Sequence, residues 1–285
     1  VGNDADPASA SGADAGDPFV GRQDVLQVLD RRLEAVDGAG SCVIVGEPGI
    51  GKTALLHRLA TRTPSRVVLA RGVETEAILP YAVASDVLLP FRQKLTGLPP
   101  VQQRALEGAL ALADGPVENG LAVCAGALGL LVAAGDERPV VVLVDDLQWV
   151  DEESRRLLLF VARRLPGEHV IMVFTRREEP GHEAARYDLP EIRLKGLSVE
   201  ECESLVAAHR LRPGNGELRE LVAATGGNPL AILETLRQGE GRPPTRTPAI
   251  PVGPRLRSVW TRALAHLDER SRLALFVVAA CQGPG

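Results

Sequence analysis

The sequence has few aromatic residues and no long apolar stretch. Phe, Trp and Tyr account for 3% of its 285 residues, although hydrophobic residues as a class reach 45%. A core with so few rings has to be built from Ala, Val and Leu. No apolar stretch is long enough to span a membrane, and the N-terminus lacks the basic-then-apolar order of a signal peptide. These absences predict a soluble, cytoplasmic protein without a membrane partner.

The sequence also lacks paired cysteines, clustered histidines and an excess of positive charge. Its four cysteines are scattered without a C-x-x-C pair, and its five histidines show no metal-binding spacing. A disulfide framework or a zinc site is therefore not predicted, and reduced thiols are expected. The formal net charge of −5 provides no general attraction for nucleic acid.

Lysine occurs only three times, and one of the three, Lys52, follows a glycine-rich loop. The loop, GEPGIGKT, places Gly46 and Gly51-Lys52-Thr53 at the G-x-x-x-x-G-K-[ST] spacing of a phosphate-binding P-loop. The β-branched run at 41–45 predicts a buried strand before the loop, and leucines at helical spacing predict a helix after it. The alternative is a Gly/Pro turn without a ligand. Strand, loop and helix in this order favour the P-loop.

A P-loop predicts an ATP or ADP site with Mg²⁺. The glycines let backbone N–H groups converge on phosphate oxygens, and the helix N-terminus adds partial positive charge. Lys52 is expected to reach the β- and γ-phosphates, and the Thr53 hydroxyl to hold Mg²⁺.

Two adjacent carboxylates, Asp145 and Asp146, end a second apolar run at 140–144. A buried strand that delivers acids at its C-terminal end is the Walker B arrangement. The first carboxylate is expected to orient Mg²⁺ through water, and the second to polarise the attacking water. Two Asp residues that merely end a strand and cap a helix are the alternative, which the nearby P-loop disfavours.

A third apolar run, at 169–177, ends in Thr-Arg-Arg. Polar residues at the C-terminal edge of a parallel sheet lie where ligands bind in open α/β folds. One of the two arginines, Arg176 or Arg177, is therefore expected to contact the γ-phosphate. A solvated arginine pair in a loop remains the alternative.

The chain divides into five predicted segments. Residues 1–17 are small and acidic and are expected to be disordered. Residues 18–197 form an α/β nucleotide-binding domain, and 198–238 a small helical lid domain that opens with a capping box. Residues 239–254 are a proline-rich linker. Residues 255–285 start a further helical domain that the chain ends before completing.

The nucleotide-binding segment predicts a parallel sheet with helices on both sides. Two more strands are expected at 66–72 and 191–196, and an amphipathic helix is expected before the loop, near residues 25–36. Residues 81–134 are expected to form several helices, broken at 98–100 and 114–116.

Five segments in this order, FVGR (19–22), GEPGIGKTALL, VVLVDDLQWVD, VFTRRE and TGGNPLAI, resemble the STAND-type signal-transduction NTPases. More closely, they resemble the N-terminal ATPase module of the large ATP-binding regulators of the LuxR family, over about residues 18–280. The resemblance implies an ASCE/AAA-like P-loop NTPase fold, a helical domain and the start of a winged-helix domain.

The resemblance also implies a function. Family members are mostly transcriptional regulators in which ATP and ADP select an open, assembling state or a closed, resting state. This implies weak ATPase activity, ATP or ADP as ligand and self-association in the ATP state. It implies DNA binding only through a C-terminal domain absent from this chain.

Individual site residues are implied as well. The segment Val20-Gly21-Arg22 resembles the part that packs against adenine, and Pro229 resembles the helical-domain proline that closes over the base. The Walker A positions are Gly46, Gly49, Ile50, Gly51, Lys52, Thr53 and Ala54. Gln23 departs from the family, which usually has Glu after Gly-Arg.

The Walker B positions, Asp145 and Asp146, complete this implied site. Thr53 and Asp145 are the implied metal ligands, and Lys52, Asp146 and Arg177 are the implied catalytic residues. Arg177 matches the sensor arginine through its T-x-R spacing from Thr175, with Arg176 as the second choice.

Two rival functions are a housekeeping P-loop ATPase of AAA or kinase type and a nucleotide-binding scaffold without turnover. A kinase needs an arginine-rich lid, but the segment after Arg177 is acidic (EEPGHE). A motor needs a trans-acting arginine finger, and no candidate is evident. The intact Asp145 and Asp146 argue against a scaffold.

Overall fold

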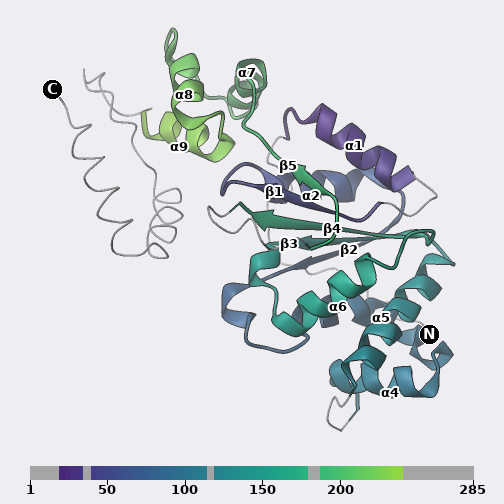
Figure 1. The fold of residues 1–285 in the computed structure, drawn as a ribbon. Helices are drawn as coiled ribbons and strands as arrows, with labels where there is room; N and C mark the ends of the chain where they lie inside the picture. The colour runs from purple at the N-terminus through teal and green to yellow at the C-terminus, as the bar shows by residue number, and fades with distance from the viewer. Residues whose placement is uncertain (1–18, 35–39, 114–118, 179–186, 240–285) are drawn as a thin grey trace, which may run out of the picture.

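Five parallel strands form one sheet at the centre of the structure (Figure 1). The computed structural model describes residues 19–34, 40–113, 119–178 and 187–239. The strand order is β2-β3-β4-β1-β5, and each neighbouring pair is parallel. In chain order, the elements of the described residues are α1 (Gln23–Glu34), β1 (Cys42–Gly46), α2 (Lys52–Arg62), β2 (Arg66–Arg71), η1 (Glu74–Glu76), α3 (Ala82–Leu88), η2 (Leu89–Gly97), α4 (Pro100–Ala109), α5 (Gly120–Gly135), β3 (Val140–Asp145), η3 (Leu147–Trp149), α6 (Glu152–Ala162), β4 (Val170–Arg177), β5 (Glu191–Arg193), α7 (Val199–Ala208), α8 (Glu217–Thr225) and α9 (Pro229–Gly239).

The inner strands are buried because helices cover both faces of the sheet. β1 and β3 are buried along their whole length, which suits their uninterrupted Val- and Ile-rich sequences. The strands predicted at 41–45, 66–72, 140–144 and 169–177 correspond to β1, β2, β3 and β4. The parallel α/β sheet predicted from the sequence is thus confirmed.

The last predicted strand is shorter than expected. β5 covers Glu191–Arg193, whereas the sequence pattern extends to residue 196. β5 is the edge strand beside β1, so it has a hydrogen-bonding partner on one side only. The N–H of Leu194 still donates to the carbonyl of Val45 at 2.8 Å, and the chain then leaves the sheet toward α7.

The two faces of the sheet carry separate hydrophobic clusters. α1 and α2 cover one face, where Leu26 and Leu55 pack with Ile44 of β1. α3, α5 and α6 cover the other face, where Leu130 and Leu158 are fully buried. Figure 1 shows α1 and α2 on one side of the strands and α5 and α6 on the other.

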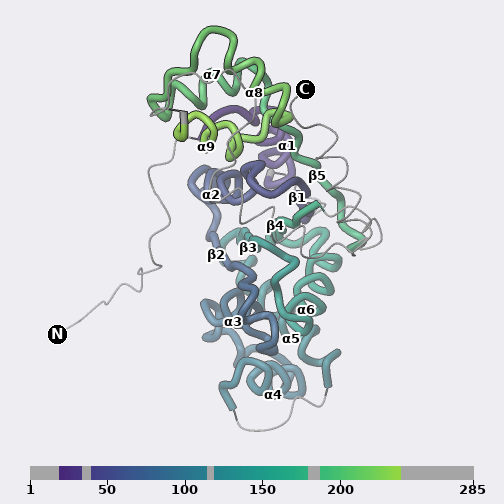
Figure 2. Tube along the Cα trace, turned by 90° about the vertical axis from the view of Figure 1, so that its left-hand side faces the viewer, coloured from purple at the N-terminus to yellow at the C-terminus, as the bar shows by residue number. Residues whose placement is uncertain are grey.

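The connection from β2 to β3 forms helices on the second face. α3, η2, α4 and α5 occupy the region predicted to be helical, and α4 begins at Pro100, at the predicted break. The second predicted break, at 114–116, lies outside the described residues. In Figure 2, α4 and α5 lie at the opposite end of the molecule from α7, α8 and α9.

Helices α7, α8 and α9, which we name the α7–α9 unit, enclose a third hydrophobic cluster that includes Cys202, Leu221 and Ile232. The capping box predicted at the start of α7 is present, with Ser198 and Glu201 each bonding the other's backbone. The division at residues 197 and 198 stays a prediction.

Several sequence predictions concern other parts of the chain. The disordered tail at 1–17 and the domain start at 255–285 lie outside the described residues. The linker predicted from residue 239 does too, except that Gly239 ends α9. Within the described ranges, no helix is long and apolar enough to cross a membrane.

Candidate functional site

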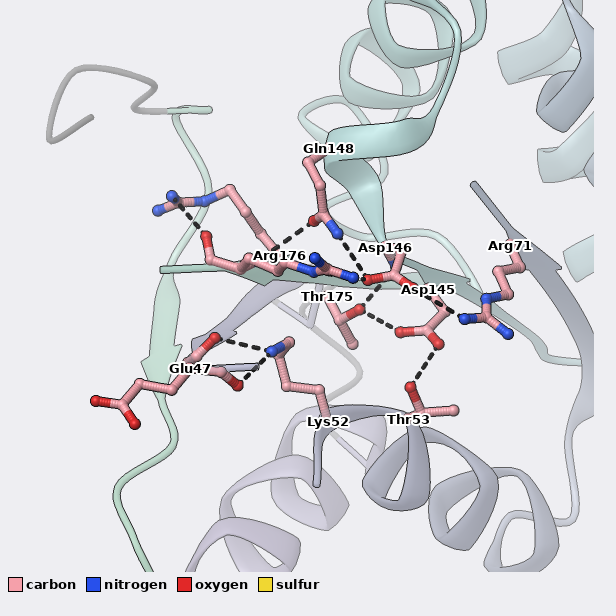
Figure 3. A network of polar contacts seen from close by, with 11 residues as sticks. Glu47, Lys52, Thr53, Arg71, Asp145, Asp146, Gln148, Thr175 and Arg176 are labelled. Atoms are coloured by element: carbon pink, nitrogen blue, oxygen red, sulfur yellow. Dashed lines mark hydrogen bonds and ion pairs between the residues drawn. The ribbon is translucent and has the colours of Figure 1, made fainter. Parts of the chain in front are cut away.

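The carboxyl ends of β1, β3 and β4 lie at the same edge of the sheet, and the predicted residues Lys52, Thr53, Asp145 and Asp146 lie close together there (Figure 3). β1 ends at Gly46, β3 at Asp145 and β4 at Arg177. The strand register places Gly46 beside Arg177. Ligands of open α/β sheets bind outside this edge.

The glycine-rich loop runs from the end of β1 to the start of α2. Gly49 and Gly51 have φ angles of 79° and 100°, in the left-handed region that favours glycine. The N-cap of α2, Gly51, has no side chain to bond the first backbone N–H groups. These N–H groups and the helix dipole make the turn suited to an anion. Ile50 packs into the cluster below the loop, while Ala54 is exposed on α2.

Lys52 lies under the loop and is mostly buried. Its Nζ donates hydrogen bonds to the carbonyl oxygens of Gly46 and Glu47, both at 2.8 Å. Burial lowers the pKa of Lys52 to about 8, an effect that the nearby carboxylates of Asp146 and Asp145 oppose. Phosphate oxygens at this position would supply the negative charge that a desolvated ammonium requires.

Thr53, Asp145 and Thr175 form a chain of hydrogen bonds. The Thr53 hydroxyl donates to Oδ2 of Asp145 at 2.7 Å, and the buried Thr175 hydroxyl donates to its Oδ1 at 2.5 Å. This hydroxyl also accepts the N–H of Asp146 at 2.9 Å. Thr175 therefore fixes both carboxylate residues in place.

The facing oxygens of Thr53 and Asp145 fit Mg²⁺. Magnesium prefers oxygen ligands and is usually held by one or two protein groups together with substrate phosphates and water. The site thus fits Mg²⁺ that is bound with a nucleotide.

Asp146 lies between two arginines that come from the strands flanking β3. Its Oδ2 is 3.3 Å from a guanidinium nitrogen of Arg71, and its Oδ1 is 3.8 Å from Nε of Arg177. The side chain of Gln148 donates to the same Oδ1 at 2.6 Å and accepts the N–H of Arg177 at 3.1 Å. Asp146 has a φ of 54°, and this left-handed turn starts η3, which carries Gln148. The carboxylate of Asp146 is thereby held in place by Arg71, Arg177 and Gln148.

The two candidate arginines point in different directions. Arg177 lies over the ring of Trp149, 5.8 Å from its centroid, and near Asp146. Arg176 instead pairs with Glu191 of β5 at 3.2 Å. Successive residues of a strand face opposite sides of the sheet, so only Arg177 lies on the side of Asp146.

Of the positions implied for the adenine, Val20 and Arg22 contact the α7–α9 unit or the loop, and Pro229 belongs to that unit. Val20 packs against the hydrophobic cluster of that unit. The guanidinium of Arg22 donates to the carbonyl of Ile50 at 3.0 Å and to that of Lys195. Pro229 is the first residue of α9. These residues and the loop thus occupy one region of the molecule.

Sequence reasoning missed several residues of this region. Arg71 ends β2, whose sequence carries no motif. It lies near Asp146 only because β2 pairs with β3. Gln148 follows the Walker B carboxylates and Asn228 lies in the GGNPL segment, but neither motif predicts that Gln148 bonds Asp146 or that Asn228 bonds the carbonyl of Pro48. Thr175 served only to set a spacing, although a buried hydroxyl before the arginines is itself a signal.

A parallel sheet in this order, with a glycine-rich loop after β1 and adjacent carboxylates after β3, defines a P-loop NTPase. The family model described as "AAA ATPase domain" matches residues 18–173, which is more than half of the chain. The chain therefore belongs to the AAA ATPase domain family. No match was found among curated proteins.

Three solved structures match this chain, each with a TM-score below 0.5. A STAND protein with a tetratricopeptide repeat sensor from Pyrococcus horikoshii is 21% identical, with a TM-score of 0.49; the match covers 88% of this chain and 33% of that chain. A Walker-type ATPase of Pyrococcus abyssi is 16% identical, with a TM-score of 0.47 and coverages of 93% and 77%. The Aeropyrum pernix Orc1 protein in complex with DNA is 17% identical, with a TM-score of 0.47 and coverages of 94% and 74%. The chain thus spans about a third of the STAND protein.

Proposed function

We propose that this chain is the ATP-binding, slowly hydrolysing switch module of a STAND-type transcriptional regulator, of the large ATP-binding LuxR kind. The observation that carries the proposal is a contact between the α7–α9 unit and the phosphate-binding loop. The side-chain amide of Asn228 donates to the carbonyl of Pro48 at 3.0 Å, and the N–H of Leu230 donates to that of Gly49 at 3.3 Å. A nucleotide in the loop is therefore sensed by two bodies, and ATP and ADP favour different arrangements of them.

Each site residue has a proposed role. Lys52 binds the β- and γ-phosphates, and Thr53 and Asp145 hold Mg²⁺, which neutralises phosphate charge when it is bound. Asp146 orients the attacking water and accepts its proton. Arg177 contacts the γ-phosphate, and its backbone N–H is already fixed by Gln148. Lys52 thus serves binding and, with Asp146 and Arg177, hydrolysis.

The remaining parts of the proposal rest on the order of the sequence motifs. The Val20-Gly21-Arg22 segment and Pro229 enclose the adenine, and residues 18–197 and 198–238 act as two domains. The ATP state self-associates. DNA is bound by a C-terminal domain outside this chain, and the protein acts in the cytoplasm.

Nucleotide analysis and turnover measurements test the proposal together. Chromatography of the denatured protein identifies any nucleotide that copurifies, and titrations measure the affinities for ATP and ADP. Phosphate release is then measured with Mg²⁺, and phosphate transfer to small acceptors is measured in parallel, with Lys52→Ala as the control for contaminating ATPase.

The proposed switch predicts tight binding and turnover well below about 10 s⁻¹, the median of enzymes. Binding without any hydrolysis would indicate a scaffold. Transfer to an acceptor would indicate a kinase, and turnover at or above the median would indicate a motor. A protein that binds neither nucleotide refutes all of these functions.

A further inference from the structure

Every backbone carbonyl of the loop, from Gly46 to Ile50, accepts a hydrogen bond from a group in or around the site. The first two, at Gly46 and Glu47, accept from Nζ of Lys52. The next two accept from the α7–α9 unit: the carbonyl of Pro48 accepts from Asn228 and that of Gly49 from the N–H of Leu230. The fifth, at Ile50, accepts from Arg22. The carbonyls of the loop are thus bonded by three groups: Lys52, the α7–α9 unit and Arg22.

Holding these carbonyls fixes the direction of the N–H groups that would bind phosphate. In a planar trans peptide the C=O and the following N–H point in opposite directions. A carbonyl of Pro48 that is turned toward Asn228 therefore turns the N–H of Gly49 away from the α7–α9 unit. In the same way, the carbonyl of Ile50 is turned toward Arg22, so the N–H of Gly51 points away from Arg22.

The backbone around Asn228 holds this residue in a fixed position. It is 6% exposed, and it follows two glycines with φ angles of 61° and 75°. The N–H of Leu197 donates to the carbonyl of Gly227 at 2.8 Å, and a Cβ on Gly196 would lie 1.6 Å from the carbonyl oxygen of Gly226. Backbone contacts on both sides therefore fix the turn that presents Asn228.

The loop is shaped to receive this contact. A Cβ on Gly49 would lie 2.8 Å from Cβ of Leu230 and 3.1 Å from Oδ1 of Asn228. Glycine at this position thus permits the close approach of α9 as well as the left-handed turn of the loop.

We infer that Asn228 is a positioning residue for the phosphate-binding loop, and that its bond to Pro48 couples docking of the α7–α9 unit to nucleotide affinity. The inference rests on the proposed function, because it assumes that the loop binds a nucleotide. Nucleotide binding orders the loop and so favours docking of α9, and docked α9 raises nucleotide affinity by the same factor.

The side chain of Asn228 does two things that a substitution can separate. Its Oδ1 accepts the N–H of Ala231 at 3.4 Å, in the manner of a helix N-cap, while its Nδ2 reaches the loop. Asn228→Ser keeps an N-cap acceptor on α9, but the shorter side chain has no amide to reach Pro48. Asn119→Ser is the matched control, because Asn119 caps α5 through the N–H of Ala122 at 3.0 Å, away from the loop.

The test measures ADP affinity by equilibrium titration in the wild-type chain and in both variants. Losing one hydrogen bond that forms in the docked state is expected to weaken binding about three- to tenfold in Asn228→Ser. Asn119→Ser should bind ADP as the wild type does. The unfolding temperature without nucleotide shows how much each substitution destabilises the protein through its effect on the helix N-cap.

Hydrogen exchange measures the coupling itself. ADP should slow exchange of the N–H of Leu230 in the wild type, because that group donates to the loop, and the slowing should shrink in Asn228→Ser. Unchanged ADP affinity in Asn228→Ser, or exchange at Leu230 that ADP does not affect, would overturn the inference while leaving the proposed function intact. A wild-type chain that binds neither ADP nor ATP would instead overturn both.

Discussion

A Cβ atom on Gly72 would lie 2.5 Å from the carbonyl oxygen of Asp146. The N–H of Gly72 donates to the carbonyl of Asp145 at 2.9 Å, so the chain leaving β2 lies directly against the turn that carries both carboxylates. Because Arg71 directly precedes Gly72, this packing also brings the guanidinium of Arg71 to the carboxylate of Asp146. Gly72, which lies outside the sequence motifs of the site, thus helps to place the second carboxylate.

Gly72→Ala should therefore reduce both stability and ATP hydrolysis. The added methyl group meets backbone atoms that have no room to move, and overpacking of this kind costs about 1 to 3 kcal/mol of unfolding free energy. Thermal unfolding checks the stability effect. Gly97→Ala is the control, since a Cβ there meets nothing within 4 Å; equal melting temperatures for the two variants would show that the contact is unimportant.

Asp146→Asn should slow hydrolysis by about 10² to 10⁴-fold, the usual contribution of general-base assistance. Affinity for ATP should be almost unchanged, because the carboxylate acts on the transition state and not on the bound nucleotide. Phosphate release and equilibrium titration measure the two effects. Asp136→Asn removes an exposed carboxylate at the end of α5 and should change neither, whereas joint loss of binding and hydrolysis in Asp146→Asn would contradict the assigned role.

Lys52→Ala should abolish measurable binding of ATP and ADP while the fold persists. Removing a desolvated ammonium offsets the loss of its two hydrogen bonds to the loop, so the melting temperature without nucleotide should change little. Titration and thermal unfolding test both statements. Lys94→Ala, which breaks a surface ion pair with Glu137, should bind normally; wild-type affinity in Lys52→Ala would refute the P-loop assignment.

Arg177→Ala and Arg176→Ala should differ sharply. Arg177 lies beside Asp146, so its loss should slow hydrolysis by about tenfold or more, as expected for a group that stabilises developing charge. Arg176 pairs with Glu191 at the edge strand, and its loss should leave turnover nearly unchanged. Single-turnover hydrolysis under saturating ATP measures both variants, and a reversed order would make Arg176 the γ-phosphate contact.

The sequence was sufficient for the sheet and the loop because their signals are local. Apolar β-branched runs mark β1 and β3, and the spacing of Gly46, Gly51 and Lys52 marks the loop between its strand and helix. Each of these patterns depends only on residues that are neighbours in the chain. The helical cover of both faces then follows from the parallel pairing of the strands, because the crossover connections place helices on the faces of such a sheet.

The contacts around the loop and Asp146 were not predictable because they join distant segments. Arg71 and Asp146 are separated by 75 residues, and Asn228 and Pro48 by 180. Their meeting depends on strand order and on the placement of α9, which no local pattern specifies. The choice between Arg176 and Arg177 likewise required knowing which side of β4 faces Asp146.

The backbone bond between Leu197 and Gly227 joins the beginnings of α7 and α9. At the start of α7, Glu201 accepts the N–H of Arg22 at 2.9 Å, and at the start of α9, Asn228 bonds the loop. The bond between the two helix starts thus links the contact of α9 with the loop to the contact of α7 with Arg22. In the switch we propose, the two contacts are therefore expected to form and break together.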